Sequence, residues 1–335
     1  MALSPDPIRH NQLVDVARLY YLHELTHQQI ADKLGLSRVK VTRLLRQAVE
    51  EQVVEFRIAD PVMDTLDLQD CLEDRFGLRQ AIVVPSGDTE AQTVAAVGRF
   101  AAAWLDERLA DNLVLGLGWG RTLNAIPPHL EPNRHAGIQV VSLTGGLAAN
   151  ANQPNPYDTV TAVAASLGAQ PRYLLLPAVA DSPTTRELLL REASARAITA
   201  LWERVDIAMM SIGLLSAGTG VFYSLADPDA GVAAVIEAGG VGDILARPID
   251  IDGQTVPTEL ADRTIAIGPE ALSHVPLVVG VAAGGDKARA IQGALRTGLL
   301  NVLITDDEAA VRILELAAPD ERIARGPERA SGAPG

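Results

Sequence analysis

The sequence contains few of the residues from which disulfides and metal clusters are built. Its 335 residues include one cysteine, Cys71, and aromatic residues make up 4% of the chain. One cysteine cannot form an internal disulfide or a cysteine zinc cluster, and a lone thiol in a reducing compartment is usually a small buried apolar group. The first twelve residues have no apolar run, so no secretory signal is visible. We therefore expect a cytoplasmic protein.

Basic residues are also scarce. The chain has 28 Lys and Arg against 42 Asp and Glu, which gives a net charge of −14 and argues against a protein that coats nucleic acid over its whole surface. One stretch, residues 207–226, has no charge, but it is rich in glycine and has no basic cluster on either side. A strand followed by a glycine-rich loop explains this stretch better than a membrane helix does, so we expect no membrane partner.

The basic residues that are present gather near the N-terminus. Residues 1–58 carry eight basic and seven acidic side chains, and the rest of the chain carries 20 basic and 35 acidic ones. Lys33–Val49 contains five basic residues and no acid. Because attraction to phosphates is local and screened by salt, this stripe predicts a confined contact with a polyanion. A solvated helix face is the alternative.

The same segment has the pattern of a helix-turn-helix. Thr26 and Gln29 form a predicted capping box at the start of a short apolar-faced helix, and Gly35 is placed to end it. Ser37 then caps a second helix, whose apolar side carries Val41, Leu44, Leu45 and Ala48. An earlier amphipathic helix, with apolar residues from Leu13 to Tyr21, precedes the pair.

Two short helices joined by a glycine turn, the second with a basic outer face, are what docking in the DNA major groove requires. The first turn of such a helix meets base edges, and the residues around it hold phosphates. The residues predicted at or near bases are Val39, Lys40 and Arg43, and those predicted at phosphates are Arg38, Thr42 and Arg46. These patterns agree and predict binding to double-stranded DNA, with a plain helical hairpin as the alternative.

A domain boundary is predicted where this segment ends. Val53–Ile58 alternates as a short strand or wing does, and Asp60-Pro61 breaks the pattern. Leu66–Phe76 then reads as a helix with Leu68, Leu72 and Phe76 buried. We expect a DNA-binding domain at 1–58, a larger domain at 59–318 and a disordered tail at 319–335, which is rich in Gly, Pro, Ala and charge.

The larger segment alternates short apolar runs with helical patterns. Runs that are apolar on both faces and separated by helices predict a mainly parallel sheet covered on both sides, an α/β fold. The predicted strands are 81–84, 113–117, 139–143, 173–176, 206–212, 264–267, 277–281 and 302–305, and the main predicted helices are 89–109, 159–167, 184–204 and 287–297.

Glycines follow several of these strands, and ligands of parallel sheets bind at the strands' carboxyl ends. One loop has Gly118, Gly120, Arg121 and Thr122 before a helix, where backbone N–H groups, a cation and a hydroxyl could hold an anion. The other predicted ligand residues are Gly145, Gly146, Asp243 and Lys287, and Asn150, Asn152 and Asn155 follow the second pair of glycines. The alternatives are tight turns, a polar surface loop and a solvent-exposed lysine.

These residues resemble the SorC family of bacterial sugar-responsive transcriptional regulators. The resemblance extends over about Gln12 to Leu316 and rests on strings such as Ile30-Ala31, Leu34–Arg38, Gly116–Thr122, Leu143–Gly146, Gly242–Ile244 and Ala283–Lys287. It implies a helix-turn-helix head and an effector domain similar to phosphosugar isomerases and glucosamine-phosphate deaminases (NagB/RpiA/CoA-transferase-like). It also implies a homodimer or homotetramer and a sugar, polyol or sugar-phosphate effector, with Arg121 and Thr122 in a phosphate loop, Gly145 and Gly146 beside the ligand and Lys287 at its anion.

Besides a protein-interaction module with a vestigial pocket, two functions remain open at this point. The first is a DNA-binding regulator whose affinity for operator DNA is controlled by its effector. The second is a sugar-phosphate isomerase or deaminase on the same fold, which would need an acid/base carboxylate and a histidine near the ligand. Three of the six histidines lie in the first 27 residues and none adjoins a glycine loop, so we predict a regulator without catalytic residues, cofactor or metal.

Overall fold

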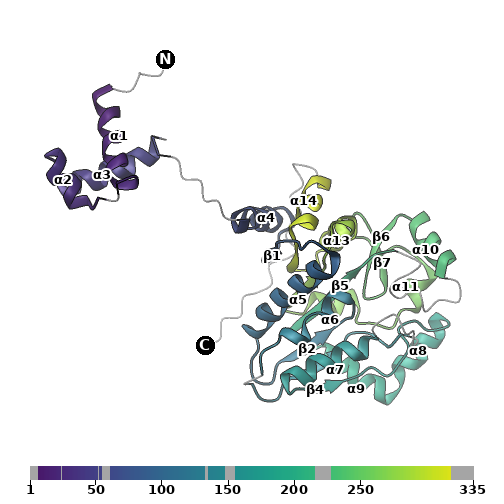
Figure 1. Ribbon diagram of the computed structural model, residues 1–335. Coiled ribbons are helices and arrows are strands. Elements are labelled where there is room, and N and C mark those ends of the chain that lie inside the picture. The colour runs from purple at the N-terminus through teal and green to yellow at the C-terminus, as the bar shows by residue number, and fades with distance from the viewer. Residues whose placement is uncertain are drawn as a thin grey trace. The chain divides into compact units, whose positions relative to one another are not determined.

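The computed structural model describes residues 7–23, 25–51, 53–54, 61–132, 135–147, 155–215 and 228–317. It divides the chain into two compact units, Met1–Asp60 and Pro61–Gly335, which we call the head and the body (Figure 1). The predicted tail, residues 55–58 of the predicted wing, and Asn150 and Asn152 lie outside the described residues. Within the described residues, no helix has the length and apolar character needed to span a membrane.

The head consists of three helices around a small apolar core. They are α1 (Pro7–Tyr21), α2 (His27–Leu34) and α3 (Arg38–Glu50). The core is contributed by one face of each helix, as the apolar spacing predicts. Its buried members are Leu13, Val16, Ala17, Ile30, Ala31, Val41, Leu44, Leu45 and Ala48.

The predicted caps that begin and end these helices are confirmed. The Thr26 hydroxyl accepts the amide of Gln29, and the Gln29 side chain accepts the amide of Thr26 at 2.9 Å. Gly35 ends α2 with φ at +64°, a conformation that costs a non-glycine residue about 1–2 kcal/mol. Ser37 caps α3 by accepting the amide of Lys40 at 3.2 Å. The turn between α2 and α3 therefore follows from local residue chemistry.

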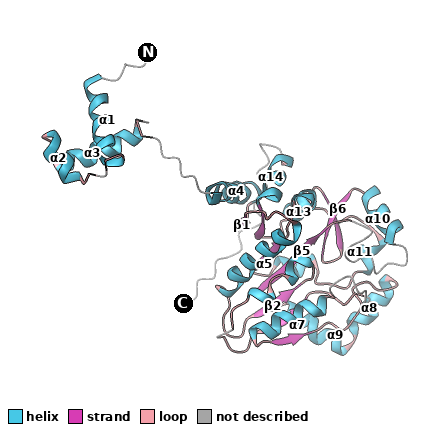
Figure 2. Ribbon diagram, in the orientation of Figure 1, coloured by secondary structure: helices cyan, strands magenta, loops and turns pink. Residues whose placement is uncertain are grey.

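The body is built on a mainly parallel sheet, shown in magenta between cyan helices in Figure 2. The central order is β1-β9-β8-β5-β2-β3-β4, and all six pairings along it are parallel. The α/β fold class predicted from the sequence is confirmed. The strands are β1 (Gln80–Val84), β2 (Val114–Leu117), β3 (Gln139–Ser142), β4 (Gln170–Arg172), β5 (Ile207–Gly213), β8 (Leu277–Val281) and β9 (Val302–Asp306).

An antiparallel hairpin extends the sheet from the carboxyl end of β5. It consists of β6 (Gly240–Ile244) and β7 (Arg247–Asp250), and Gly213 of β5 pairs with Asp243 of β6. The sequence predicts no strand here: it indicates Asp243 as a ligand residue, with a turn as the alternative. The two residues that join the strands, Leu245 and Ala246, have φ of +50° and +64°, which suits a tight hairpin but is unfavourable for residues other than glycine.

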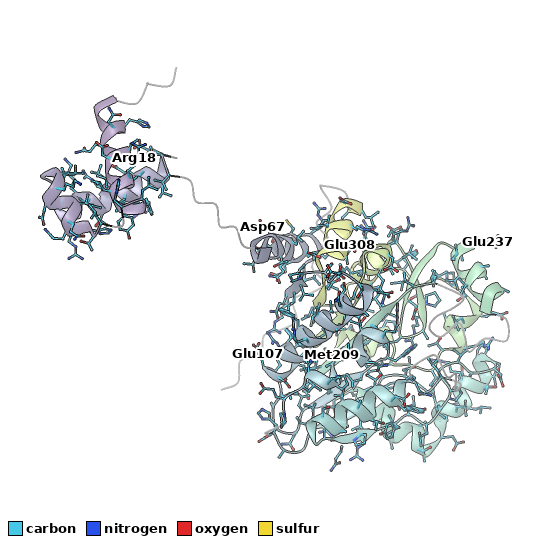
Figure 3. All side chains as sticks on the ribbon, in the orientation of Figure 1. Arg18, Asp67, Glu107, Met209, Glu237 and Glu308 are labelled. Atoms are coloured by element: carbon cyan, nitrogen blue, oxygen red, sulfur yellow. The ribbon has the colours of Figure 1, made fainter. Side chains whose placement is uncertain are left out.

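Helices cover both faces of the sheet, and alternate residues of β5 show it. Ala208, Met210 and Ile212 belong to one apolar core, and Ile207 and Met209 belong to the other. In Figure 3, Met209 lies inside the body, and Glu107, Glu237 and Glu308 lie on its periphery. Successive side chains of a strand point to opposite faces, so each face of the sheet has its own packed layer.

Thirteen helical segments surround the sheet in the part of the body that is described. They are α4 (Pro61–Phe76), α5 (Glu90–Asp106), α6 (Arg121–Asn124), η1 (Pro127–His129), α7 (Pro156–Leu167), α8 (Pro183–Arg191), α9 (Ala193–Trp202), α10 (Pro228–Glu237), α11 (Glu259–Arg263), α12 (Pro269–Ser273), η3 (Gly285–Lys287), α13 (Ala288–Arg296) and α14 (Asp307–Leu316). The predicted buried face of α4 is confirmed, since Leu72 and Phe76 are buried and Leu68 packs beside them.

Four sequence predictions about these elements are wrong. The single helix 184–204 is two helices, because Glu192 has extended backbone between α8 and α9. The strand at 173–176 lies earlier, at Gln170–Arg172, where it pairs with β3. The segment 264–267 makes isolated bridges instead of a ladder. Cys71 is exposed on α4, not buried, because it lies off the face that packs on the sheet.

Candidate functional site

The topology of the sheet brings the ends of β2 and β5 together. From β2 the chain continues to β3 on one side, whereas from β5 it continues, through the β6–β7 hairpin, to β8 on the other side. The amide of Gly118, just past β2, donates to the carbonyl of Met209 in β5 at 2.9 Å. Ligands of open parallel sheets bind outside the strand ends where the order reverses in this way. We call this place the strand-end site, and the predicted ligand residues described next, Gly118–Thr122, Asp243 and Lys287, lie around it.

The glycine loop after β2 contributes close packing and one cation. A Cβ on Gly118 would lie 2.7 Å from Leu245 of the hairpin turn, and one on Gly120 would lie 2.4 Å from the Ser211 hydroxyl. Arg121 is exposed and pairs with Glu90, the first residue of α5, at 2.7 Å. Thr122 is buried, with 1% of its surface exposed. The loop therefore lies tightly against both β5 and the hairpin.

Lys287 reaches the same place from the loop after β8. Its side chain is buried, and its Nζ donates to the carbonyl of Ile212 near the end of β5 at 3.2 Å. Burial and the nearby Arg121 charge lower the pKa of Lys287, while Asp286, Asp243 and Glu90 oppose that shift. The alternative of a solvent-exposed surface lysine is wrong, because the loop turns the side chain inward against β5.

Asp243 is the buried carboxylate of the site. The β5–β6 pairing places one carboxylate oxygen against Gly213, where a Cβ would lie 1.9 Å from it, and the other accepts the amide of Ala246 at 3.0 Å. Burial raises the pKa of Asp243 to about 6, against the opposing effects of the Ala246 amide and the Lys287 charge. A carboxyl group with this pKa changes its charge close to neutral pH.

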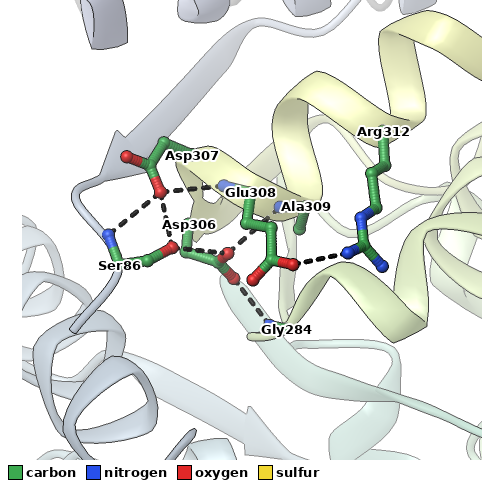
Figure 4. Close-up of polar contacts among 7 residues, drawn as sticks. All are labelled: Ser86, Gly284, Asp306, Asp307, Glu308, Ala309 and Arg312. Atoms are coloured by element: carbon green, nitrogen blue, oxygen red, sulfur yellow. Dashed lines mark hydrogen bonds and ion pairs between the residues drawn. The ribbon is translucent and has the colours of Figure 1, made fainter. Parts of the chain in front are cut away.

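Asp306 holds the loop that carries Lys287, as Figure 4 shows. Its carboxylate accepts the amide of Gly284 at 2.6 Å, the amide of Ala309 at 3.0 Å and the hydroxyl of Ser86 at 3.1 Å. Gly284 has φ of +106°, and its carbonyl accepts the amide of Lys287. Asp306 thus fixes the ends of β1 and β8 and the start of α14 relative to one another.

Gly145 and Gly146 have a packing role in the structure. Their amides donate to the carbonyls of Ile265 and Leu176 at 3.0 and 2.7 Å, so these two donors are already used. A Cβ on Gly145 would lie 2.4 Å from the Pro177 carbonyl, and one on Gly146 would lie 2.7 Å from the Tyr157 ring. Asn155 caps α7 by accepting the amide of Tyr157. The placement of Gly145 and Gly146 beside the ligand stays a prediction.

Two residues that the sequence did not indicate lie at the strand-end site. The Ser211 hydroxyl is buried in β5 beside Gly120 and has no hydrogen-bond partner among the described atoms. Glu90 pairs with Arg121, as described above. Their spacing in the sequence carries no signal, because strand pairing and helix packing alone bring these positions together. Among the described residues, no group of three or more His, Cys, Asp or Glu could hold a metal ion.

In the head, α3 presents most of the predicted contact residues to solvent. Arg38, Val39, Thr42, Arg43 and Arg46 are exposed, and Lys40 is half-buried. Val39 is 80% exposed, which is unusual for a branched apolar side chain on a packed helix. The Thr42 hydroxyl lies 3.2 Å from both the His27 ring and the Arg38 carbonyl, so it links the first turn of α2 to α3.

Comparison with known proteins identifies the family. A family described as "Putative sugar-binding domain" matches residues 60–315, and one described as "Sigma-70, region 4" matches residues 15–51. The chain is 30% identical to the deoxyribonucleoside regulator of Bacillus subtilis (strain 168), over 89% of this chain and 95% of that protein. It is also 30% identical to the erythritol catabolism regulatory protein of Brucella abortus (strain 2308), over 89% of this chain and 94% of that protein.

A solved structure extends the likeness to the whole fold. The full-length sorbitol operon regulator SorC from Klebsiella pneumoniae has a TM-score of 0.69 and 27% identity, over 91% of this chain and 99% of that one. The chain belongs to the SorC family of sugar-binding transcriptional regulators. The family, the fold class and the function of a DNA-binding regulator predicted from the sequence are thereby confirmed, and the enzyme alternative is disfavoured.

Proposed function

We propose that the head binds operator DNA through the exposed face of α3. Val39, Lys40 and Arg43 meet base edges in the major groove, and Arg38, Thr42 and Arg46 hold the flanking phosphates. The exposure of five of these six side chains supports the proposal, as does the absence of acidic residues between Lys33 and Val49. The half-buried Lys40 reaches DNA through the flexible end of its side chain.

The effector binds at the strand-end site in this proposal. Asp243 accepts hydroxyl groups, Lys287 and Arg121 hold an electronegative or anionic group, and the tight loop Gly118–Thr122 shapes the floor. The names of the relatives above refer to sorbitol, erythritol and deoxyribonucleosides. These names support a polyhydroxy compound as the effector: a sugar, a polyol or a sugar phosphate. Binding there favours one arrangement of paired heads over another and so changes operator affinity.

The observation that carries this proposal is the gathering of Arg121, Asp243 and Lys287 at the ends of β2 and β5. Their charges act on one another even though they come from three distant segments of the chain. A buried lysine and a buried carboxyl group of shifted pKa are costly to the fold and are typical of ligand sites.

The test is a thermal-shift screen of the full-length protein against sugars, polyols and their phosphates. A compound that binds the native state raises the unfolding temperature, and the effector should do so in wild type but not in Lys287→Met. The Met side chain keeps the length and removes the charge. Lys287→Met should still bind operator DNA without effector in a mobility-shift assay. Loss of both properties would point to misfolding, and an effector response that survives in Lys287→Met would refute the assigned site.

Assembly, location and lack of catalysis complete the proposal. Two or four copies pair their heads on half-sites about one helical turn apart, in the cytoplasm where operator DNA lies. The body performs no turnover: Asp243 is one carboxylate, and three of the described histidines have partners elsewhere, His27 with Thr42, His135 with Asp111 and His274 with the Glu270 carbonyl. Light scattering measures the assembly, and a sugar-phosphate isomerase assay of the full-length protein checks for turnover.

A further inference from the structure

Two arginines bind neighbouring carbonyls of one extended segment in the body. Arg186 of α8 donates from its Nε to the Thr264 carbonyl at 2.7 Å. Arg247 of β7 donates to the Ala266 carbonyl at 3.0 Å and to the Ile267 carbonyl at 2.6 Å. In an extended segment, alternate carbonyls point to the same side and lie about 7 Å apart, so Thr264 and Ala266 hold the two guanidinium groups side by side.

No acidic side chain neutralises this pair in the part of the chain that the structure describes. Neither Arg186 nor Arg247 has an ion pair with any described carboxylate, although the protein has 42 acidic residues and a net charge of −14. Arg247 is half-buried, and burial together with the positive charge of Arg186 lowers the pKa of Arg247 to about 10. Carbonyl oxygens offset only part of two positive charges, so the pair repels itself unless an anion is present.

The pair does not belong to the strand-end site. In the β6–β7 hairpin Arg247 is paired with Ile244, and Asp243 is paired with Pro248. Cross-strand partners share a face, and successive residues point to opposite faces. Arg247 therefore lies on the opposite face of the hairpin from Asp243, where it binds the carbonyls of Ala266 and Ile267.

The guanidinium donors suit an oxyanion. Arg186 uses its Nε on the Thr264 carbonyl, which leaves the two terminal nitrogens of a planar group that matches carboxylate or phosphate oxygens two at a time. A phosphate group carries about −1.5 to −2 charges at pH 7 and three acceptor oxygens, which complements two guanidinium groups whose positive charges act on each other.

We propose that Arg186 and Arg247 form a second anion site, which binds a phosphate group between them, as free phosphate or as a phosphate monoester. The anion ties α8 to β7 and to the segment Thr264–Ile267. Because the same hairpin carries Asp243 on its other face, an anion at this second site acts on an element that forms the strand-end site. The proposal stands apart from the choice of effector.

The test measures thermal unfolding of the full-length protein at pH 7.5 in inorganic phosphate and in sodium chloride of matched ionic strength. Wild type should show a saturable rise of about 2–4 °C in phosphate over chloride, the shift that a modest binding energy gives a domain of this size. Arg186→Gln should lose this rise. Lys287→Met should keep it, because Lys287 lies at the other site. Arg172→Gln should keep it as well, because the hydrogen bonds of Arg172 to described residues go to the neutral side chains of Gln139 and Gln170.

A second comparison separates an anion site from a structural arginine. In chloride alone, Arg186→Gln should be at least as stable as wild type, because it removes the repulsion. A variant equally destabilised in both salts would show a purely structural role and overturn the proposal. Arg247→Lys, which keeps the charge but loses the paired carbonyl bonds, should weaken the phosphate response without abolishing it.

The remaining outcomes are also decisive. A phosphate response that disappears in Lys287→Met and persists in Arg186→Gln would place the anion at the strand-end site and overturn the second site while leaving the effector proposal standing. No response in wild type to inorganic phosphate or to glycerol 3-phosphate would overturn it as well. If glycerol 3-phosphate gives the larger Arg186-dependent rise, the natural occupant is a phosphate monoester, and the reverse result indicates free phosphate.

Discussion

The head and the body use charge in opposite ways. On α3 of the head, Arg38 and Arg43 are exposed to solvent, and the neighbouring turns supply no acid between Lys33 and Val49. In the body, Lys287 and Asp243 are buried beside the ends of the strands, and burial shifts the pKa of both. Exposed charges respond to salt, because counterions screen them, whereas buried ones respond to pH, because burial penalises the charged form. The two sites should therefore be separable by solution conditions alone.

The largest expected effect is the pH dependence of the body's stability. The pKa of Asp243 is raised from 3.8 to about 6, so between these values the folded protein holds a proton that the unfolded chain releases. Stability from this group is thus present at acid pH and is lost as pH rises through about 6, by about 3 kcal/mol at 1.36 kcal/mol per unit. Asp243→Asn cannot titrate and should lack this loss.

Urea unfolding between pH 4 and pH 7.5 checks this prediction, with tryptophan fluorescence as the probe. All three tryptophans lie in the body, at 104, 119 and 202. The difference in unfolding free energy between wild type and Asp243→Asn should change by about 2 kcal/mol across that range, because the unfolded chain has already released part of its protons at pH 4. Taking this difference cancels constant effects of the substitution. A difference that does not vary with pH would show that Asp243 titrates normally and contradict the contrast between the two regions.

The next effect is on operator affinity. Arg43→Ala should weaken operator binding by about 1–3 kcal/mol if Arg43 meets a base, and it should relax sequence preference at one position. Arg18→Ala removes the same charge from an exposed position on α1 and serves as the control, with a smaller loss expected. Fluorescence anisotropy over a range of salt concentrations measures both. If the two variants lose the same affinity, only general charge matters and α3 is not the reading surface.

The head and the body also differ in how far the sequence predicts their structure. The head is predictable because its determinants are local: Thr26 and Gln29 are three residues apart, and Gly35 and Ser37 sit at the turn they define. The predicted strands of the body largely hold as well. The hairpin β6–β7 was missed, because it forms by pairing with β5, about 30 residues earlier in the chain. The burial of Lys287 depends on the Ile212 carbonyl, 75 residues away, which no spacing rule reveals.

A pair of glycines tests whether the two regions also unfold separately. Gly35 in the head and Gly168 in the body both end a helix with φ near +60°, and a Cβ on either would meet nothing within 4 Å. Alanine at each should cost about 1 kcal/mol from backbone strain alone. The unfolding temperature should fall by about 4–8 °C for the small head and about 2–4 °C for the body, because the shift scales inversely with unfolding entropy.

Far-UV circular dichroism reports both regions, and tryptophan fluorescence reports the body. Gly35→Ala should shift only the dichroism transition, and Gly168→Ala should shift the fluorescence transition. If Gly35→Ala moved the fluorescence transition by the same amount, the head and the body would unfold as one cooperative unit. The head and the body, which divide at Asp60, would then be two compact units that do not unfold independently.

The smallest effect concerns Arg121, a predicted ligand residue of the body whose charge is exposed to solvent, as the charges of the α3 arginines are. Arg121 and Glu90 pair at 2.7 Å with side chains 57% and 60% exposed. An exposed pair of this kind contributes about 0.2–1 kcal/mol and less in high salt. A double-mutant cycle with Arg121→Gln and Glu90→Gln should give a coupling in that range that falls between 0.05 and 0.5 M salt. A coupling energy of several kcal/mol that does not change with salt concentration would mean that Arg121 is shielded from solvent as Lys287 is. The buried charges would then extend through the whole strand-end site.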